Sequence, residues 1–139
     1  TYAEDPYSLS KWVLEQQADA FARRNAGLRI ASLRFHALVA NREQGIEINQ
    51  RLGAGAIRHL WAYTLMNAAC RACLLALTAD FTGHEAFYIV APDALASEPS
   101  LALAARHYPA TTIQGDLSGH AGFFNCAKAE QRLGWRHQD

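Results

Sequence analysis

The sequence predicts an α/β fold, and three observations support this prediction. Apolar residues recur at helical spacing from about residue 6 to residue 25. The segment 28–35 that follows is apolar without strict alternation, as expected of a strand that is covered on both faces in a parallel sheet. A helix followed closely by such a strand is half of a βαβ unit, from which parallel sheets are built.

The first helix has clear start and stop signals. Asp5 at the N-cap can accept a hydrogen bond from an unpaired backbone amide, and Pro6 at the first helical position has no amide to satisfy. Two arginines at 23 and 24, followed by Gly27, suit the end of a helix. We therefore predict a helix at about 6–25 and a strand at 28–35.

The rest of the chain has weaker signals. Residues 37–58 contain few periodic apolar positions, so we predict a long and largely irregular segment. Helical spacing returns from Leu60 to Leu77, and a strand is expected at 86–90. The remaining predicted elements are a helix starting at 97–99, a short strand at 111–114, and a last helix capped by Asn125 and ended by Gly134.

The composition is that of one neutral globular domain. The chain has 139 residues, half of them hydrophobic, which is enough for one domain with a core. Thirteen basic and thirteen acidic residues give a net charge of zero, so no global field attracts polyanions. No apolar run is long enough to cross a bilayer, no signal peptide is apparent, and three cysteines suit a reducing compartment. We expect a cytoplasmic protein that binds neither nucleic acid nor membrane.

The stretch Tyr7-Ser-Leu-Ser-Lys11 is the main candidate for chemistry. Its tyrosine and lysine are four residues apart, so their side chains share one face of the predicted helix. A neighbouring ammonium group favours the ionised form of a phenol and so lowers its pKa from about 10 towards the range of a general acid/base. The same pair also arises by chance at the start of a helix, so the motif needs support from other residues.

Three later stretches accompany this helix in a recognisable order. The first part is the predicted helix with the strand ending Leu33-Arg34-Phe35. The three later stretches are Trp61-Ala-Tyr63 with the helix at 69–77, Phe87-Tyr-Ile-Val-Ala-Pro92, and Lys128-Ala-Glu-Gln-Arg-Leu-Gly134-Trp135. Together these stretches resemble the extended short-chain dehydrogenases/reductases, the NAD-dependent epimerase/dehydratase family. They span nearly the whole chain.

The resemblance implies the C-terminal part of a doubly wound, Rossmann-like parallel-sheet enzyme with a smaller substrate-binding lobe. Residues 1–36 then end the dinucleotide-binding domain. Residues 37–139 form mainly the substrate-binding lobe, with a helix at 60–78 and a strand at 86–90 returning to the sheet. The sequence contains no glycine-rich turn of the kind that holds a dinucleotide's pyrophosphate, so we expect a piece of a larger protein.

The resemblance also implies a reaction. The parent is expected to be an NAD- or NADP-dependent epimerase, dehydratase or dehydrogenase acting on a sugar or nucleotide sugar. Tyr7 is its expected general acid/base, and Lys11 both lowers the pKa of that phenol and binds the nicotinamide ribose. The expected cofactor contacts are Tyr7, Lys11, Phe35 and His36, and the expected substrate contacts are Ala37, Arg58 and Trp61. We also expect a homodimer through the Tyr7–Lys11 helix.

Departures from the family leave other interpretations open. Members usually carry Asp at the positions of Leu65 and Ala68, and often Asn near Ala37. A non-catalytic binding or regulatory module derived from the same fold is therefore one alternative to an enzyme. An inactive structural fragment is another.

The cysteines and histidines do not form a metal motif. Cys70 and Cys73 have the spacing of a metal knuckle or redox pair, but no second pair follows. They fall in a predicted helix rich in alanine and leucine, so we expect buried structural cysteines. The six histidines are scattered along the chain, and we predict no metal.

Overall fold

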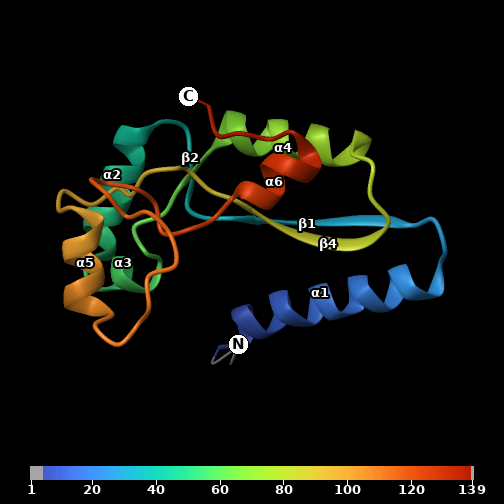
Figure 1. Ribbon diagram of the computed structural model, residues 1–139, viewed down its shortest axis with the longest axis horizontal. Helices are drawn as coiled ribbons and strands as arrows, with labels where there is room; N and C mark the ends of the chain where they lie inside the picture. Colours follow the sequence, from blue (N-terminus) through green and yellow to red (C-terminus); the bar gives the residue numbers. More distant parts are fainter. Residues whose placement is uncertain (1–4, 139) are drawn as a thin grey trace.

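A computed structural model describes residues 5–138 and shows a mixed α/β arrangement (Figure 1). The elements in chain order are α1 (Pro6–Arg24), β1 (Arg29–Phe35), β2 (Leu38–Val39), α2 (Arg42–Leu52), α3 (Gly55–Arg58), β3 (Thr64–Leu65), α4 (Met66–Thr78), β4 (Gly83–Ile89), α5 (Ser100–His107) and α6 (Ala127–Leu133). β1 and β4 pair in parallel along their whole length, and β2 pairs in parallel with β3. The predicted α/β class with parallel strands is confirmed.

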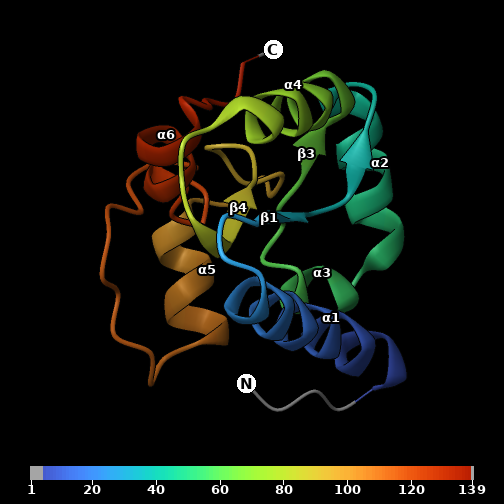
Figure 2. The same ribbon diagram turned by 90° about the vertical axis from the view of Figure 1, so that its right-hand side faces the viewer.

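Helices cover both faces of the β1–β4 sheet. α1 lies along one face, and α4 and α6 lie along the other (Figure 1). α2, α3 and α5 gather beyond the C-terminal ends of the two strands, while Figure 2 shows the strands nearly end-on with α1 below and α4 above them. None of the helices within residues 5–138 combines the length and the apolar character that a membrane-spanning segment needs.

Helix α1 begins and ends close to the predicted positions. The Asp5 carboxylate accepts hydrogen bonds from the Ser8 amide at 2.9 Å and from the Ser8 hydroxyl at 2.6 Å. These two bonds hold the pKa of Asp5 below its usual value. At the other end, the Asn25 side chain donates to the carbonyl of Phe21 at 2.9 Å. The predicted helix over 6–25 is confirmed.

The buried apolar side chains form two clusters. The larger one joins the sheet to α4 and α6 and contains Val39, Tyr63, Leu65, Ala68, Ala72, Phe81, Phe87, Ile89, Ala91, Leu95, Ala129, Leu133 and Trp135. The smaller one joins α3, α5 and the segments between them and contains Ala56, Trp61, Ala94 and Leu103. Helix α1 contributes no buried residue to either cluster.

The prediction of an irregular segment at 37–58 is wrong, because this segment contains β2, α2 and α3. Asn41 caps α2 by accepting a hydrogen bond from the Gln44 amide at 2.9 Å. The buried residue of α2 is Gly45, and a Cβ atom there would lie 3.0 Å from Leu95 Cδ1. A helix that packs through a glycine shows little apolar periodicity, and for this reason the sequence pattern missed it.

Other predicted boundaries also need correction. The helix predicted from residue 60 begins only at Met66, because residues 61–63 are not helical and Thr64–Leu65 form β3. The strand predicted at 86–90 is Gly83–Ile89. No strand forms at 111–114. α5 starts at Ser100, directly after the predicted start at 97–99.

The predictions for the last helix and for the cysteines are confirmed only in part. The N-cap residue of α6 is Cys126, but the Asn125 side chain still accepts a hydrogen bond from the Ala127 amide at 2.9 Å. Gly134 ends the helix in the left-handed conformation, with φ 67°, as predicted. The expectation of buried cysteines is wrong for Cys70 and Cys73, which lie on the exposed side of α4.

Candidate functional site

A cavity of about 580 Å³ lies between the N-terminal half of α1 and the C-terminal end of β1. Residues of both elements line it. They are Tyr7, Lys11, Leu14 and Glu15 of α1 and residues 32–38 of β1 and the turn that follows. The structure therefore brings five of the sequence-predicted site residues, Tyr7, Lys11, Phe35, His36 and Ala37, to one cavity.

Tyr7 and Lys11 lie side by side at the start of α1. The Lys11 Nζ atom is 5.2 Å from the centre of the Tyr7 ring, a distance at which a cation is attracted to an aromatic face. The Tyr7 side chain is 70 % exposed, so a ligand in the cavity can reach its hydroxyl group. A phenol and an ammonium group are thus available together at this wall of the cavity.

Thr64 organises the opposite end of the cavity, where β1 ends. Its side chain is fully buried, accepts a hydrogen bond from the His36 amide at 3.1 Å and donates one to the Ile89 carbonyl at 2.6 Å. Thr64 thereby joins the ends of β1 and β4. Ala37, the residue after His36, has φ 23°, a conformation that residues other than glycine adopt rarely. The chain therefore turns sharply at the cavity wall.

The His36 side chain is half-buried beside this turn. Its ring lies 4.3 Å from the ring of Phe124, measured between centres. Burial lowers the pKa of His36, and the nearby His59 lowers it further. At neutral pH the imidazole is therefore uncharged, with one nitrogen that can donate a hydrogen bond and one that can accept.

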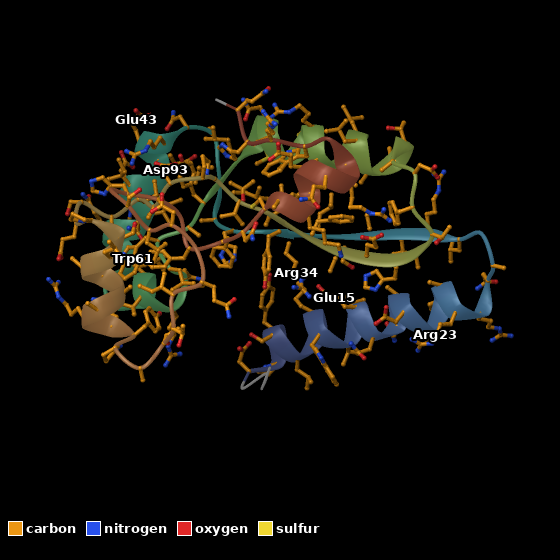
Figure 3. The ribbon with its side chains drawn as sticks, in the orientation of Figure 1. Glu15, Arg23, Arg34, Glu43, Trp61 and Asp93 are labelled. Carbon is orange, nitrogen blue, oxygen red and sulfur yellow. The ribbon has the colours of Figure 1, made fainter. Side chains whose placement is uncertain are left out.

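Arg34 and Glu15 connect β1 to α1 at the edge of the cavity. The Arg34 guanidinium donates two hydrogen bonds to the Glu15 carboxylate, at 2.7 and 2.5 Å (Figure 3). This pairing holds the pKa of Glu15 below and that of Arg34 above their usual values. Arg34 also lies over the ring of Tyr88, at 5.2 Å from its centre. Glu15 and Arg34 were not among the residues predicted for the site.

Trp61 and Arg58 lie away from the Tyr7 cavity. Trp61 lies far from the start of α1 (Figure 3), is 7 % exposed and belongs to the smaller core cluster. It lines a second cavity of about 710 Å³ between α2, α3 and α5. Arg58 is exposed at the end of α3 and lines neither cavity. The second cavity also contains Arg42, whose Nε donates to Asp93 at 3.0 Å. The structure does not bring these predicted substrate contacts next to Tyr7.

Comparison with known proteins identifies one similar solved structure. No family model matches the sequence, and no curated protein matches it significantly. The structure of MoeE5 in complex with UDP-glucuronic acid and NAD is similar, with a TM-score of 0.61 and 19 % sequence identity. The match covers 99 % of this chain and 52 % of MoeE5, so the chain spans about half the length of that protein. The similarity confirms the Rossmann-like α/β fold.

The two positions where the resembled family usually has Asp are part of the larger core. Leu65 is 5 % exposed and Ala68 is fully buried. The C-terminal segment covers them: the Trp135 indole donates to the Ala68 carbonyl at 2.9 Å, and the Leu65 amide donates to the His137 ring at 3.3 Å. Apolar residues fit this environment because an unpaired carboxylate would be costly to bury there.

The part of the chain that the structure covers, residues 5–138, contains no cluster of three histidine, cysteine, aspartate or glutamate side chains suited to a metal ion. Cys70 and Cys73 are exposed. The side chains that line the Tyr7 cavity include the phenol of Tyr7, the ammonium group of Lys11 and the imidazole of His36.

Proposed function

We propose that this chain carries the acid/base part of an NAD-dependent enzyme that acts on a sugar or nucleotide sugar as an epimerase, dehydratase or dehydrogenase. The observation that supports this proposal most strongly is the cavity that Tyr7 and Lys11 share with the end of β1. The fold gives further support, because it is similar to that of MoeE5, whose structure contains UDP-glucuronic acid and NAD.

The cavity residues fit the requirements of such a reaction. When NAD is bound, it accepts a hydride from a carbon that carries a hydroxyl group, or returns one to a carbonyl. The Tyr7 phenolate would take the proton from the substrate hydroxyl as a base, and the resulting Tyr7 phenol would give it to the carbonyl oxygen as an acid in the reverse direction. The Lys11 ammonium group lies 5.2 Å from the centre of the Tyr7 ring, and its N–H groups can bind the nicotinamide ribose.

His36, Phe35 and Ala37 form the opposite wall. Because burial keeps His36 uncharged, it can hydrogen-bond a sugar or nicotinamide amide through both a donor and an acceptor. Phe35 and Ala37 offer apolar contact and a close backbone approach at the end of β1. The part of the chain formed by α2, α3 and α5 is called the helical lobe. Arg58 and Trp61 can contact the substrate only if it extends into this lobe, which a nucleotide sugar does more readily than a free sugar.

Turnover by the full-length gene product tests this proposal. The protein should be incubated with NAD and UDP-glucuronic acid, and then with other nucleotide sugars, while NADH absorbance and sugar products are followed. Formation of NADH or of an epimerised or dehydrated sugar supports the proposal. Unchanged sugars together with no measurable affinity for NAD would contradict it and would favour the alternative of a binding module.

The isolated chain should bind NAD or NADP only weakly. Affinity for a dinucleotide in such folds depends on a glycine-rich turn at a helix N-terminus. A few hydrogen bonds from Lys11 and the end of β1, worth about 0.5 to 1.5 kcal/mol each, do not offset the lost translational and rotational freedom of the ligand. We expect a Kd no tighter than about 1 mM, roughly −4 kcal/mol, in a calorimetric titration of residues 1–139. A Kd in the micromolar range would show that NAD contacts more of this chain than Lys11 and the end of β1.

We also expect a homodimer through α1. Leu9, Trp12 and Val13 leave 48 %, 50 % and 38 % of their surfaces exposed, and apolar surface of this kind commonly marks an interface. Sedimentation should show a dimer at tens of micromolar, and Trp12→Lys should convert it to a monomer. Leu77→Lys, at an equally apolar but more exposed position on α4, serves as the control and should leave the dimer intact. A wild-type protein that sediments only as a monomer would contradict this expectation.

A further inference from the structure

Two acidic side chains of helix α1 make hydrogen bonds to the β1–β4 sheet. None of its residues is buried, although it lies against both β1 and β4. Tyr7, Lys11, Glu15 and Asp19 follow one another at four-residue intervals, so they form one stripe along the helix. The first three line the cavity, and the last two make hydrogen bonds to the strands.

The two strand contacts lie on different strands. Glu15 pairs through both carboxylate oxygens with Arg34 of β1, at 2.7 and 2.5 Å. Asp19 Oδ1 lies 2.8 Å from Nδ1 of His84 on β4, and Nε2 of the same ring lies 2.8 Å from the Ser32 hydroxyl on β1. The His84 side chain is only 5 % exposed. One tautomer satisfies both bonds, with Nδ1–H donating to Asp19 and Nε2 accepting from Ser32.

These contacts fix the helix in two respects. A helix bound at one point can still rotate about its axis or slide along the sheet, but bonds to two strands at positions one turn apart oppose both movements. Tyr7 lies about 12 Å along the helix from Glu15, so a small tilt of the helix about Glu15 produces a larger displacement at the phenol, and a rotation about the helix axis turns the phenol away from the cavity. Within residues 5–138 none of the residues of α1 is buried, so apolar packing on this sheet opposes such a movement only weakly.

We propose that Glu15 and Asp19, with their partners Arg34 and His84, are positioning residues that hold Tyr7 and Lys11 at the cavity. This inference rests on the proposed function, because its kinetic consequence requires Tyr7 to take part in the reaction. The four residues act through the orientation of α1 and do not need to touch the substrate. Asp19 is the most informative of them, because it lies three turns from Tyr7 and does not line the cavity.

The test uses the full-length protein with NAD and UDP-glucuronic acid, and compares Asp19→Ala, Asp19→Asn and the control Gln17→Ala, an exposed position on the same helix. Asp19→Ala should lower kcat by about tenfold to a hundredfold, as expected for a reacting group displaced by about 1 Å, with little change in KM. Asp19→Asn keeps an oxygen that can accept from His84, so it should restore much of the lost kcat. Gln17→Ala should behave as the wild type.

Amide hydrogen exchange supplies a second measurement that does not depend on turnover. Asp19→Ala should speed exchange in α1 and leave α4 unchanged. If α1 exchange and kcat both stay at wild-type values, or if exchange rises while kcat does not fall, the positioning role is overturned. A wild-type protein without turnover contradicts the proposed function first. In that case, unchanged exchange in Asp19→Ala would show that Asp19 does not hold α1 on the sheet. Faster exchange would show that Asp19 holds α1 but has no role in catalysis.

Discussion

Replacing Tyr7 by Phe in the full-length protein should lower turnover by about two to four orders of magnitude. The substitution removes the proton donor and keeps the ring against Lys11. Because the side chain is 70 % exposed, the fold should not change. The measurement is kcat with NAD and the best nucleotide-sugar substrate, together with a circular dichroism spectrum that reports the fold.

Two further variants accompany Tyr7→Phe: a control for the loss of a phenol elsewhere, and a change of the neighbouring Lys11. Tyr108→Phe removes a phenol that donates to the Ile57 carbonyl in the helical lobe, so it should affect stability slightly and turnover not at all. Lys11→Met should lower turnover and also weaken NAD binding, since it removes the proposed contact with the ribose. Full turnover in Tyr7→Phe would exclude the hydroxyl from the mechanism.

Trp135→Ala should lower the free energy of unfolding by about 3 to 5 kcal/mol, which is typical when a buried aromatic side chain is removed. Trp135 is 1 % exposed and packs in the larger core cluster, where its indole donates to the Ala68 carbonyl. Urea unfolding measures the change. Trp135→Phe keeps most of the packing and loses the hydrogen bond, so its effect should be smaller. A loss below about 1 kcal/mol in Trp135→Ala would show that the C-terminal segment does not hold α4 and the sheet together.

The fold was predictable where local signals are strong. Asp5 and Pro6 mark the start of α1, and the structure confirms both the cap and the helix. The signals fail where a small residue faces the core. Gly45 lets α2 approach Leu95 closely, and its lack of a side chain removed the periodicity that would have revealed the helix. Boundaries such as the start of α4 at Met66 depend on the pairing of β2 with β3, which no local pattern encodes.

The candidate site was predictable in part. Tyr7 and Lys11 could be found because their spacing places them on one face of a helix, and the end of β1 was expected beside them from the family resemblance. Glu15 and Asp19 extend the same four-residue spacing, so the sequence contained a signal for them that was not used. Thr64 and Phe124 reach His36 from distant parts of the chain, and only the packed structure places them there.

A structure of the full-length protein with NAD and UDP-glucuronic acid bound tests the central claim most directly. It should place the nicotinamide in the cavity between α1 and the end of β1, with Lys11 Nζ hydrogen-bonded to the ribose. The Tyr7 hydroxyl should lie about 2.6 to 3.2 Å from a hydroxyl or carbonyl oxygen of the sugar. A nicotinamide bound outside this cavity, with Tyr7 facing solvent, would contradict the account.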